Sequence, residues 1–276
     1  MKWEQLKEKS EKRGLAPDQT LQEITQKAIL TALSEEKVFN HIVLQGGTCL
    51  RIFYDNKRLS EDLDFVLRTK GRRWDLLEWK EPITQFVSTY FPFLTDVQFS
   101  LQKESRELQR TVLRAKGDHQ NQNTRIHLEL AYVPSYFNEI RDMELYPYVS
   151  AVRVETLEEI LADKVLALMS RDYIKGRDLW DLYFLLYKHE QAIPWELVFK
   201  KVADYGMDRD VFKENIHPTI EHVLEKGEQK LRQEMERFLP HPVFQVYGGR
   251  FDSMTQDVVR NIQREYSNEV LNRETS

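Results

Sequence analysis

Two aspartates at alternate positions of a short apolar segment constrain the fold of this chain more than any other feature. Residues 62–67 read Asp-Leu-Asp-Phe-Val-Leu. In a strand, residues two apart point to the same face, so Asp62 and Asp64 share one face while Leu63 and Phe65 point into the core. Two carboxylates on one face repel each other unless a cation lies between them. The segment therefore predicts a core strand that holds Mg²⁺, or Mn²⁺ in its place, on its polar face, because Mg²⁺ prefers carboxylate oxygens and substrate phosphates as ligands.

A glycine pair comes shortly before this strand. Residues 41–45 read as a short buried strand, and Gly46, Gly47 and Thr48 then open a short helix. Glycines allow positive φ and a close approach of backbone to a ligand, and a helix N-terminus offers free N–H groups that favour phosphate. Each motif alone is more typical of a turn or an exposed strand edge, but the two in succession favour a nucleotide site.

The rest of the chain changes character near residue 155. Before it, we expect helices over residues 3–13 and 73–90 and another after Pro17 with Asp18 as its cap, and strands over 96–101, 108–115, 124–133 and 149–154. After it, we expect helices over 156–170, 177–188, 194–204, 210–226, 228–238 and 253–271. The pattern predicts an α/β (α+β) domain over residues 1–155 and an α-helical domain over residues 156–276.

The composition is that of a folded globular protein. Hydrophobic residues make up 41% and charged residues 31% of 276, with a net charge of −5. One cysteine, Cys49, excludes an intrachain disulfide. No signal peptide or membrane-spanning stretch is recognisable, so we expect a cytoplasmic protein with no membrane partner. The overall charge does not indicate nucleic-acid binding, so such a partner would have to meet a local basic patch.

One such patch follows the Asp-x-Asp strand. It consists of Arg68, Lys70, Arg72 and Arg73. These cations suit an RNA backbone, but a solvated charged loop explains them equally well.

A second charged cluster lies in the helical part. Lys164 and Arg171 fall on one face of an expected helix, and Asp178 and Asp181 fall on one face of the next. Gly176 is expected to make the turn between these helices. From the residues alone, a helical hairpin with surface salt bridges is the preferred interpretation.

The two clusters together resemble a known family. "GGT-x-LR" followed by "R-L-SEDLDF", and later "K-V-x-A-L-x-x-R" with "R-D-x-x-D-L", are similar to the motifs of AbiEii/AbiGii-type toxin nucleotidyltransferases. The first motif begins with Gln45, where many members have a lysine. The resemblance implies a nucleotidyltransferase core with a mixed β-sheet, within the DNA polymerase β-like superfamily, and a helical domain that closes the nucleotide cleft.

The resemblance also implies roles for individual residues. Asp62 and Asp64 would bind the metal, with Lys164 and Asp181 also in the catalytic set. The implied nucleotide-binding residues are Gly46, Gly47, Thr48, Arg58, Ser60, Lys164, Arg171 and Asp178. Enzymes of this superfamily commonly add a third carboxylate from a neighbouring strand, and Glu129 is the candidate, either as a base or as a metal ligand. His127 shares its face, and the alternative is that both lie on a solvated strand face.

The implied activity is transfer of a nucleoside monophosphate from an NTP to an acceptor hydroxyl. The resemblance implies RNA, the tRNA 3′ end, as acceptor, and a toxin role opposed by a separately encoded antitoxin. Two alternatives stay open. One is the same reaction on a small-molecule or protein hydroxyl, which the modest charge favours. The other is a nucleotide-binding module without turnover, which the presence of Asp62, Asp64, Lys164 and Asp181 disfavours.

Overall fold

The chain folds into two units, and the structure, a computed structural model, describes residues 1–119 and 121–274. Residues 1–55 and 59–155 form the first, which we call the sheet unit. The helical unit begins at Thr156 and also contains the segment Asn56–Arg58. The sequence did not predict that this segment packs with the helical unit, because three residues within a loop show no periodicity that would indicate their packing partners.

The sheet unit is built on a seven-stranded mixed sheet. Its strands are β1 (Ile42–Gln45), β2 (Leu63–Leu67), β3 (Leu94–Glu104), β4 (Leu108–Gly117), β5 (Asn123–Pro134), β6 (Asn138–Leu145) and β7 (Tyr148–Glu155). Across the sheet their order is β3-β4-β5-β2-β1-β7-β6. The central strand β2 pairs antiparallel with β1 and parallel with β5. The Asp-x-Asp strand therefore lies in the middle of the sheet, which explains why Leu63, Phe65 and Leu67 are buried.

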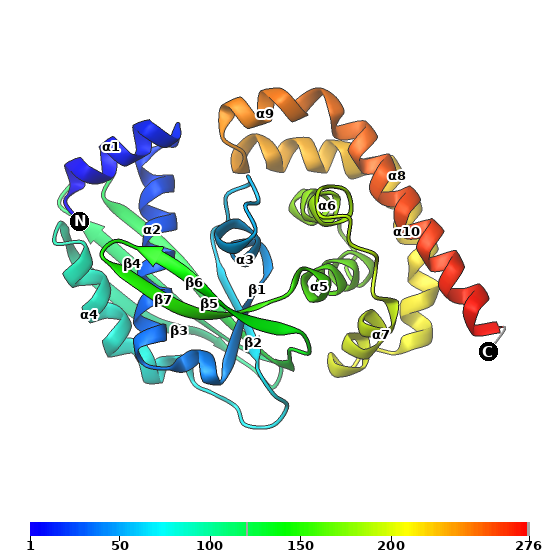
Figure 1. Ribbon diagram of the computed structural model, residues 1–276, viewed down its shortest axis with the longest axis horizontal. Coiled ribbons are helices and arrows are strands. Elements are labelled where there is room, and N and C mark those ends of the chain that lie inside the picture. The colour runs from blue at the N-terminus through cyan, green and yellow to red at the C-terminus, as the bar shows by residue number, and fades with distance from the viewer. Residues whose placement is uncertain (120, 275–276) are drawn as a thin grey trace. The chain divides into compact units, whose positions relative to one another are not determined.

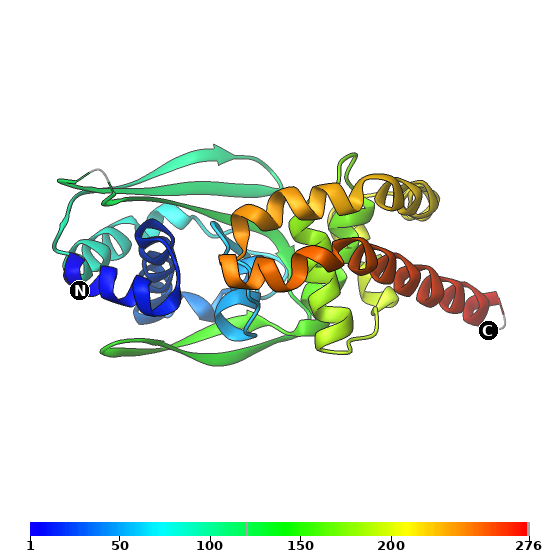
Figure 2. The ribbon, with the colours of Figure 1, turned by 90° about the horizontal axis from the view of Figure 1, so that it is seen from above.

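The sheet unit also contains four α-helices within the described residues. They are α1 (Trp3–Arg13), α2 (Pro17–Glu35), α3 (Gly46–Phe53) and α4 (Lys80–Tyr90), with short 3₁₀ turns at Val38–Asn40 and Leu76–Trp79. The long helix α2 contacts β5, β6 and β7, and α4 contacts β3. Seen from above, the β3–β4 and β6–β7 hairpins lie on opposite sides of α2 (Figure 2). The sheet is thus curved around α2, which brings the first turns of this helix near the strands.

Two expectations for the sheet unit were wrong in detail, and one strand was not predicted. Asp18 is not the cap of α2, because the helix begins one residue earlier at Pro17 and Ala16 precedes it. Residues 73–90 are not one helix, since a 3₁₀ turn precedes α4. Strand β6 was missed, because its charged outer positions leave only Met143 and Leu145 buried.

The helical unit consists of six α-helices within the described residues. They are α5 (Leu157–Met169), α6 (Gly176–Tyr183), α7 (Trp195–Asp204), α8 (Arg209–Phe238), α9 (His241–Tyr247) and α10 (Phe251–Glu274), with a π-helical turn at Phe184–Lys188 and a 3₁₀ turn at Gly248–Arg250. The Thr156 side chain caps α5 by accepting from the Glu159 N–H. Helix α10 packs along α8, and α6 contacts both (Figure 1).

Two glycines of this unit were misread as breaks. Gly227 lies inside α8, which is one helix instead of the expected two. A Cβ on Gly227 would stand 2.8 Å from the Thr255 side chain of α10. Gly176 begins α6, where a Cβ would clash with the Lys230 backbone of α8. Both glycines therefore allow close helix packing rather than a turn. The short helix α9 was also missed.

Within the described residues, no helix is both long enough and apolar enough to cross a lipid bilayer.

Candidate active site

The sheet unit brings three of the candidate carboxylates to one face. Asp64 of β2 is the register partner of Gln45 on β1 and of Glu129 on β5. Asp62 directly precedes β2 and lies two residues before Asp64, so it projects from the same side. All three carboxylate residues are half-buried. The arrangement gathers acidic oxygens at the centre of the sheet.

The first glycine of the pair lies against Asp64. Gly46 has φ of +73°, a conformation that side-chain-bearing residues rarely adopt. A Cβ at this position would stand 3.0 Å from Asp64 Oδ2. Glycine is therefore required both by the backbone conformation and by the close approach of α3 to the carboxylate. Gly47 lies behind it, buried in the first turn of α3.

The hydroxyl of Thr48 holds the backbone of the Asp-x-Asp segment. It is fully buried and donates a hydrogen bond to the carbonyl oxygen of Asp62. Gln26 of α2 donates to the Ser60 carbonyl at 2.9 Å, and Gln22 donates to the Glu61 carbonyl at 3.4 Å. These bonds fix the chain that leads into β2, so that Asp62 is held in place from two sides.

Glu129 has a cationic partner that the sequence did not reveal. Arg110 of β4 is its register partner and donates from Nε at 2.7 Å to Glu129 Oε2, and from Nη2 as well. Hydrogen bonding to Glu129 and the charges of Asp62 and Asp64 raise the pKa of Arg110. This contact follows from the register in which β4 pairs with β5, and the sequence alone does not give a strand register.

His127 lies on the same face as Glu129, as expected. Burial lowers its pKa, although the charge of Asp62 acts in the opposite direction. Its Nδ1 atom is buried and has no hydrogen-bond partner within residues 1–119 and 121–274. A neutral imidazole with an unsatisfied nitrogen is therefore placed beside Asp62.

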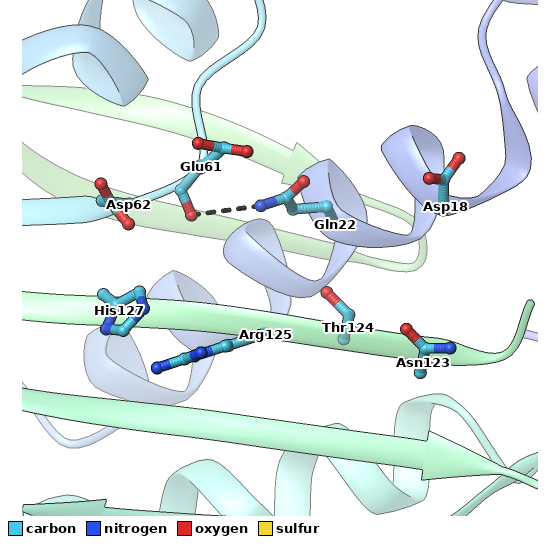
Figure 3. Close-up of a pocket in the computed structure, with 8 residues that line it drawn as sticks. All are labelled: Asp18, Gln22, Glu61, Asp62, Asn123, Thr124, Arg125 and His127. Carbon is cyan, nitrogen blue, oxygen red and sulfur yellow. Dashed lines mark hydrogen bonds between the residues drawn. The ribbon is translucent and has the colours of Figure 1, made fainter.

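A pocket of about 310 Å³ adjoins these residues (Figure 3). It is lined by Asp18, Gln22, Glu61, Asp62, Asn123, Thr124, Arg125 and His127. Asp62 and His127 stand at one end of it, and Asp18 and Asn123 at the other (Figure 3). The lining comes from α2, from the approach to β2 and from the first residues of β5, all within the sheet unit.

The helical unit assembles the second charged cluster, and it is buried rather than on the surface. Asp181 has no exposed side-chain area. Arg58 donates to it in a bidentate pair, at 2.6 Å from Nε to Oδ1 and 2.5 Å from Nη2 to Oδ2. Lys164 Nζ lies 2.7 Å from Asp181 Oδ2 and 2.9 Å from Asp178 Oδ1. Arg171 completes the cluster through an ion pair with Asp178.

The pKa shifts in this cluster follow from its three cations and two carboxylates. Burial alone would raise the pKa of both aspartates. The charges of Lys164 and Arg171 outweigh it at Asp178 and lower its pKa to about 2. Arg58 and Lys164 likewise lower the pKa of Asp181. Conversely, the two aspartates outweigh burial at Lys164 and raise its pKa. The cluster is therefore ionised throughout the neutral range, with one excess positive charge.

Asn56 and Trp180 belong to the same cluster and were not predicted. Asn56 Nδ2 donates to Asp181 Oδ1 at 2.9 Å, and Trp180 Nε1 donates to Asn56 Oδ1 at 2.8 Å. The sequence places Trp180 beside Asp181, but nothing in it connects either residue with Asn56.

The predicted basic loop has a structural explanation for two of its members. The Arg72 guanidinium lies 4.2 Å from the centroid of the Trp74 ring. Arg73 donates to the Arg106 carbonyl at 2.6 Å and lies 4.8 Å from the Tyr132 ring centroid. These contacts favour the interpretation of a folded surface loop.

The acidic residues lie on one face of a mixed sheet, and a separate helical unit carries the second charged cluster. The model of the family "Nucleotidyl transferase AbiEii toxin, Type IV TA system" matches residues 28–252. The chain therefore belongs to the AbiEii nucleotidyltransferase toxin family of type IV toxin–antitoxin systems.

Solved structures of similar fold come from Helicobacter pylori. JHP933 is 21% identical, with a TM-score of 0.50, over 95% of this chain and 100% of its own. A putative nucleotidyltransferase from H. pylori is also 21% identical, with a TM-score of 0.47, over 87% of this chain and 94% of its own. No curated protein matches the chain.

Proposed function

We propose that this protein transfers a nucleoside monophosphate from an NTP to a hydroxyl of RNA, at the tRNA 3′ end, in a reaction that depends on Mg²⁺. The toxin family implies that a separately encoded antitoxin opposes it. The observation that carries the proposal is the alignment of Asp62, Asp64 and Glu129 on one sheet face, directly beside the glycine that opens α3.

The carboxylates fit a divalent metal. Asp62 and Asp64 offer hard oxygen ligands from adjacent same-face positions, half-buried and near the middle of the sheet. Because Gly46 has no Cβ, the first turn of α3 approaches Asp64 Oδ2 closely, so backbone N–H groups that can bind phosphate lie near the carboxylate. A metal held there would neutralise the charge that develops on the transferred phosphoryl group and on the leaving pyrophosphate.

The reaction forms one P–O bond and breaks another. The acceptor hydroxyl oxygen attacks the α-phosphorus in line with the bond to the pyrophosphate, which leaves with the electron pair of that bond. The hydroxyl proton passes to a base. Glu129 is placed for this role beside Asp64, with Arg110 orienting its carboxylate.

The glycine turn is proposed to hold the triphosphate. Gly46 and Gly47 open α3 with backbone N–H groups that have no intrahelical acceptor. Since the Thr48 hydroxyl donates to the Asp62 carbonyl, we expect Thr48 to contact phosphate through its N–H and to position Asp62 with its side chain. Ser60 is expected to contribute from the segment that Gln26 anchors.

The cationic cluster of the helical unit is proposed to bind the nucleotide. Lys164 and Arg171 retain 13% and 31% of their side-chain exposure, whereas Arg58 retains 3%. We therefore expect Lys164 and Arg171 to meet phosphate, and Arg58, Asp178 and Asp181 to hold them in place.

The test uses purified protein, Mg²⁺, total cellular RNA and each α-³²P-labelled NTP in turn. Wild type is expected to label tRNA-sized RNA, and Asp64→Ala is expected to label none. Label in a small molecule or in protein instead of RNA would select the alternative acceptors. Clear NTP binding in calorimetry without any labelled product would favour a module without turnover.

A further inference from the structure

The pocket beside Asp62 is a notch in the sheet. Strand β2 pairs with β5 only from Leu128 onward. The earlier residues of β5, from Asn123, pair with β4 on one side and face the pocket on the other. Helix α2 lies across the notch, and its residues Asp18 and Gln22 line it (Figure 3). The notch therefore offers a strand edge as well as side chains to a ligand.

The charge of this notch disfavours phosphate. Asp18, Glu61 and Asp62 contribute three carboxylates, and Arg125 contributes one cation. Even with the charge of Asp62 neutralised by a metal, acidic groups remain in excess. Carboxylates accept hydrogen bonds from hydroxyl and amino groups and repel phosphate. The chemistry suits an uncharged ligand that is rich in donors, such as the sugar and base of a nucleoside, and a volume near 310 Å³ is in the range of small-ligand pockets.

A buried hydroxyl in the lining lacks a partner. Thr124 is 9% exposed, and its Oγ1 makes no hydrogen bond with any residue in the described part of the chain. The hydroxyl points across the notch toward α2 (Figure 3). Buried polar atoms are normally satisfied. An unsatisfied hydroxyl between acidic side chains is the second observation, independent of charge, that indicates a ligand here.

A basic stripe leads away from the notch along β4 and β5. Arg125 is directly opposite Arg114 in the strand register, and Lys116 is two residues further along β4 on the same face. Like charges directly opposite each other destabilise a sheet. Only one acidic residue, Asp96, is a register partner of this stripe. Arg125 and Lys116 form no ion pair with any residue that the structure describes, so the stripe carries net positive charge beside an acidic notch.

We propose that the notch receives the uncharged 3′-terminal nucleoside of an RNA acceptor, while the stripe of Arg114, Lys116 and Arg125 holds the phosphates that precede it. The reacting hydroxyl would then lie at the Asp62 end. This inference rests on the proposed function and specifies where its acceptor binds. An acidic pocket joined to a basic stripe matches a polymer that is charged along its backbone and neutral at its terminus.

The test measures binding of RNA, so it does not depend on turnover. A short fluorescent single-stranded RNA is prepared with either a 3′-hydroxyl or a 3′-phosphate, and anisotropy is recorded with EDTA and no NTP. Wild type is expected to bind the 3′-hydroxyl RNA roughly tenfold more tightly. Asp18→Asn and Glu61→Gln are each expected to reduce this preference. Asp210→Asn, in the first turn of α8, is the matched control and leaves it unchanged.

Three further variants separate ligand binding from a structural role. Thr124→Val replaces a hydroxyl that has no hydrogen-bond partner among the described residues. The melting temperature of this variant is therefore expected to equal that of wild type, while 3′-hydroxyl RNA binds a few-fold more weakly. Arg114→Ala and Arg125→Ala are each expected to lower the slope of log affinity against log salt concentration by about 1. Arg260→Ala, exposed on α10, serves as control for charge removal.

The outcomes distinguish this inference from the proposed function. If wild type labels RNA but binds both 3′ ends equally, or if Asp18→Asn keeps the full preference, the notch assignment is overturned and the transfer reaction stands. If Arg114→Ala and Arg125→Ala leave the salt slope unchanged, the stripe assignment is overturned. Transfer to a small cationic polyol, independent of both arginines, would contradict RNA as the occupant while retaining the nucleotidyltransferase activity.

Discussion

The two charged clusters of this protein contain similar side chains in opposite settings. In the sheet unit, Asp62, Asp64 and Glu129 gather acidic groups on a half-buried sheet face. In the helical unit, Asp178 and Asp181 are buried among cations that reach them at hydrogen-bonding distance. The first arrangement concentrates like charge where ligands can reach it. The second surrounds each carboxylate with cations.

This difference separates two uses of an aspartate. A carboxylate kept near other carboxylates raises the free energy of the folded protein, so its retention indicates binding or catalysis. A carboxylate buried with its counterions becomes essential to the fold, because removal of one partner leaves the others unpaired. We therefore expect substitutions in the sheet unit to change activity, and those in the helical unit to change stability first.

The largest expected effect concerns Asp64. Asp64→Asn keeps the shape of the side chain but removes one of the two carboxylates proposed to bind the metal. We expect the rate of NMP transfer to fall by about 10³-fold or more, while the free energy of unfolding stays within about 1 kcal/mol of wild type. Transfer is measured with labelled NTP, and unfolding with urea. A comparable loss of stability would remove the proposed contrast between the two clusters.

The next effect is on stability and concerns Asp181. Asp181→Ala leaves Arg58 and Lys164 buried without one of their counterions. We expect a loss of about 3–5 kcal/mol in the free energy of unfolding. Asp172→Ala, an exposed aspartate before α6, is the control and should be nearly neutral. An Asp181→Ala protein with wild-type stability but no transfer would show that the helical cluster, too, is primarily catalytic.

The sequence predicted the first cluster better than the second, for a physical reason. Alternation along one strand places Asp62 and Asp64 on a shared face without any knowledge of the fold. The strand over residues 124–133 was predicted from an equally local signal. The contacts of Arg58 with Asp181 join residues 123 positions apart, and no local pattern encodes such a pair. The resemblance singled out Arg58, but its partner became apparent only in the structure.

The same distinction explains the other omissions. Arg110 reaches Glu129 through a strand register, and Asn56 reaches Trp180 across the chain. The glycines were read by their usual association with turns, whereas Gly176 and Gly227 are required by neighbouring helices. Long-range packing determines these roles, and local sequence patterns do not reveal which distant residues pack together.

Gly46 allows a test of local geometry at the first cluster. Ala at position 46 would strain the positive φ and place a methyl group against Asp64 Oδ2. Gly14 has φ of +62°, and a Cβ added there would meet no other atom within 4 Å. Gly14→Ala therefore introduces the same backbone strain without a steric contact. We expect both variants to lose about 1–2 kcal/mol of stability, but only Gly46→Ala to lose transfer activity, by about 10²-fold. Equal activities would show that Asp64 tolerates displacement.

The pH dependence of stability tests the helical cluster. The pKa of Asp178 is lowered from its ordinary 3.8 to about 2 in the folded protein. A lowered folded-state pKa contributes stability above the unfolded-state value and loses it as the pH falls toward the folded one. We expect this group to contribute about 2 kcal/mol that disappears between about pH 4 and pH 2. In Asp178→Asn, the free energy of unfolding measured with urea should fall less steeply between about pH 4 and pH 2 than in wild type. An unchanged dependence on pH would contradict the ion-paired state of Asp178.

The smallest expected effect concerns Arg110, a cation that pairs with Glu129 of the first cluster. Its side chain is 45% exposed, as is that of Arg232, which pairs with Glu228. Exposed ion pairs contribute little, so Arg110→Met and Arg232→Met should each change the free energy of unfolding by less than about 1 kcal/mol. Arg110 differs because it orients Glu129 beside Asp64. We therefore expect kcat to fall roughly tenfold in Arg110→Met alone, as for residues that orient metal ligands. If both variants turn over at the wild-type rate, the Arg110–Glu129 pair is an ordinary surface contact, and the catalytic group shrinks to the two aspartates of the Asp-x-Asp strand.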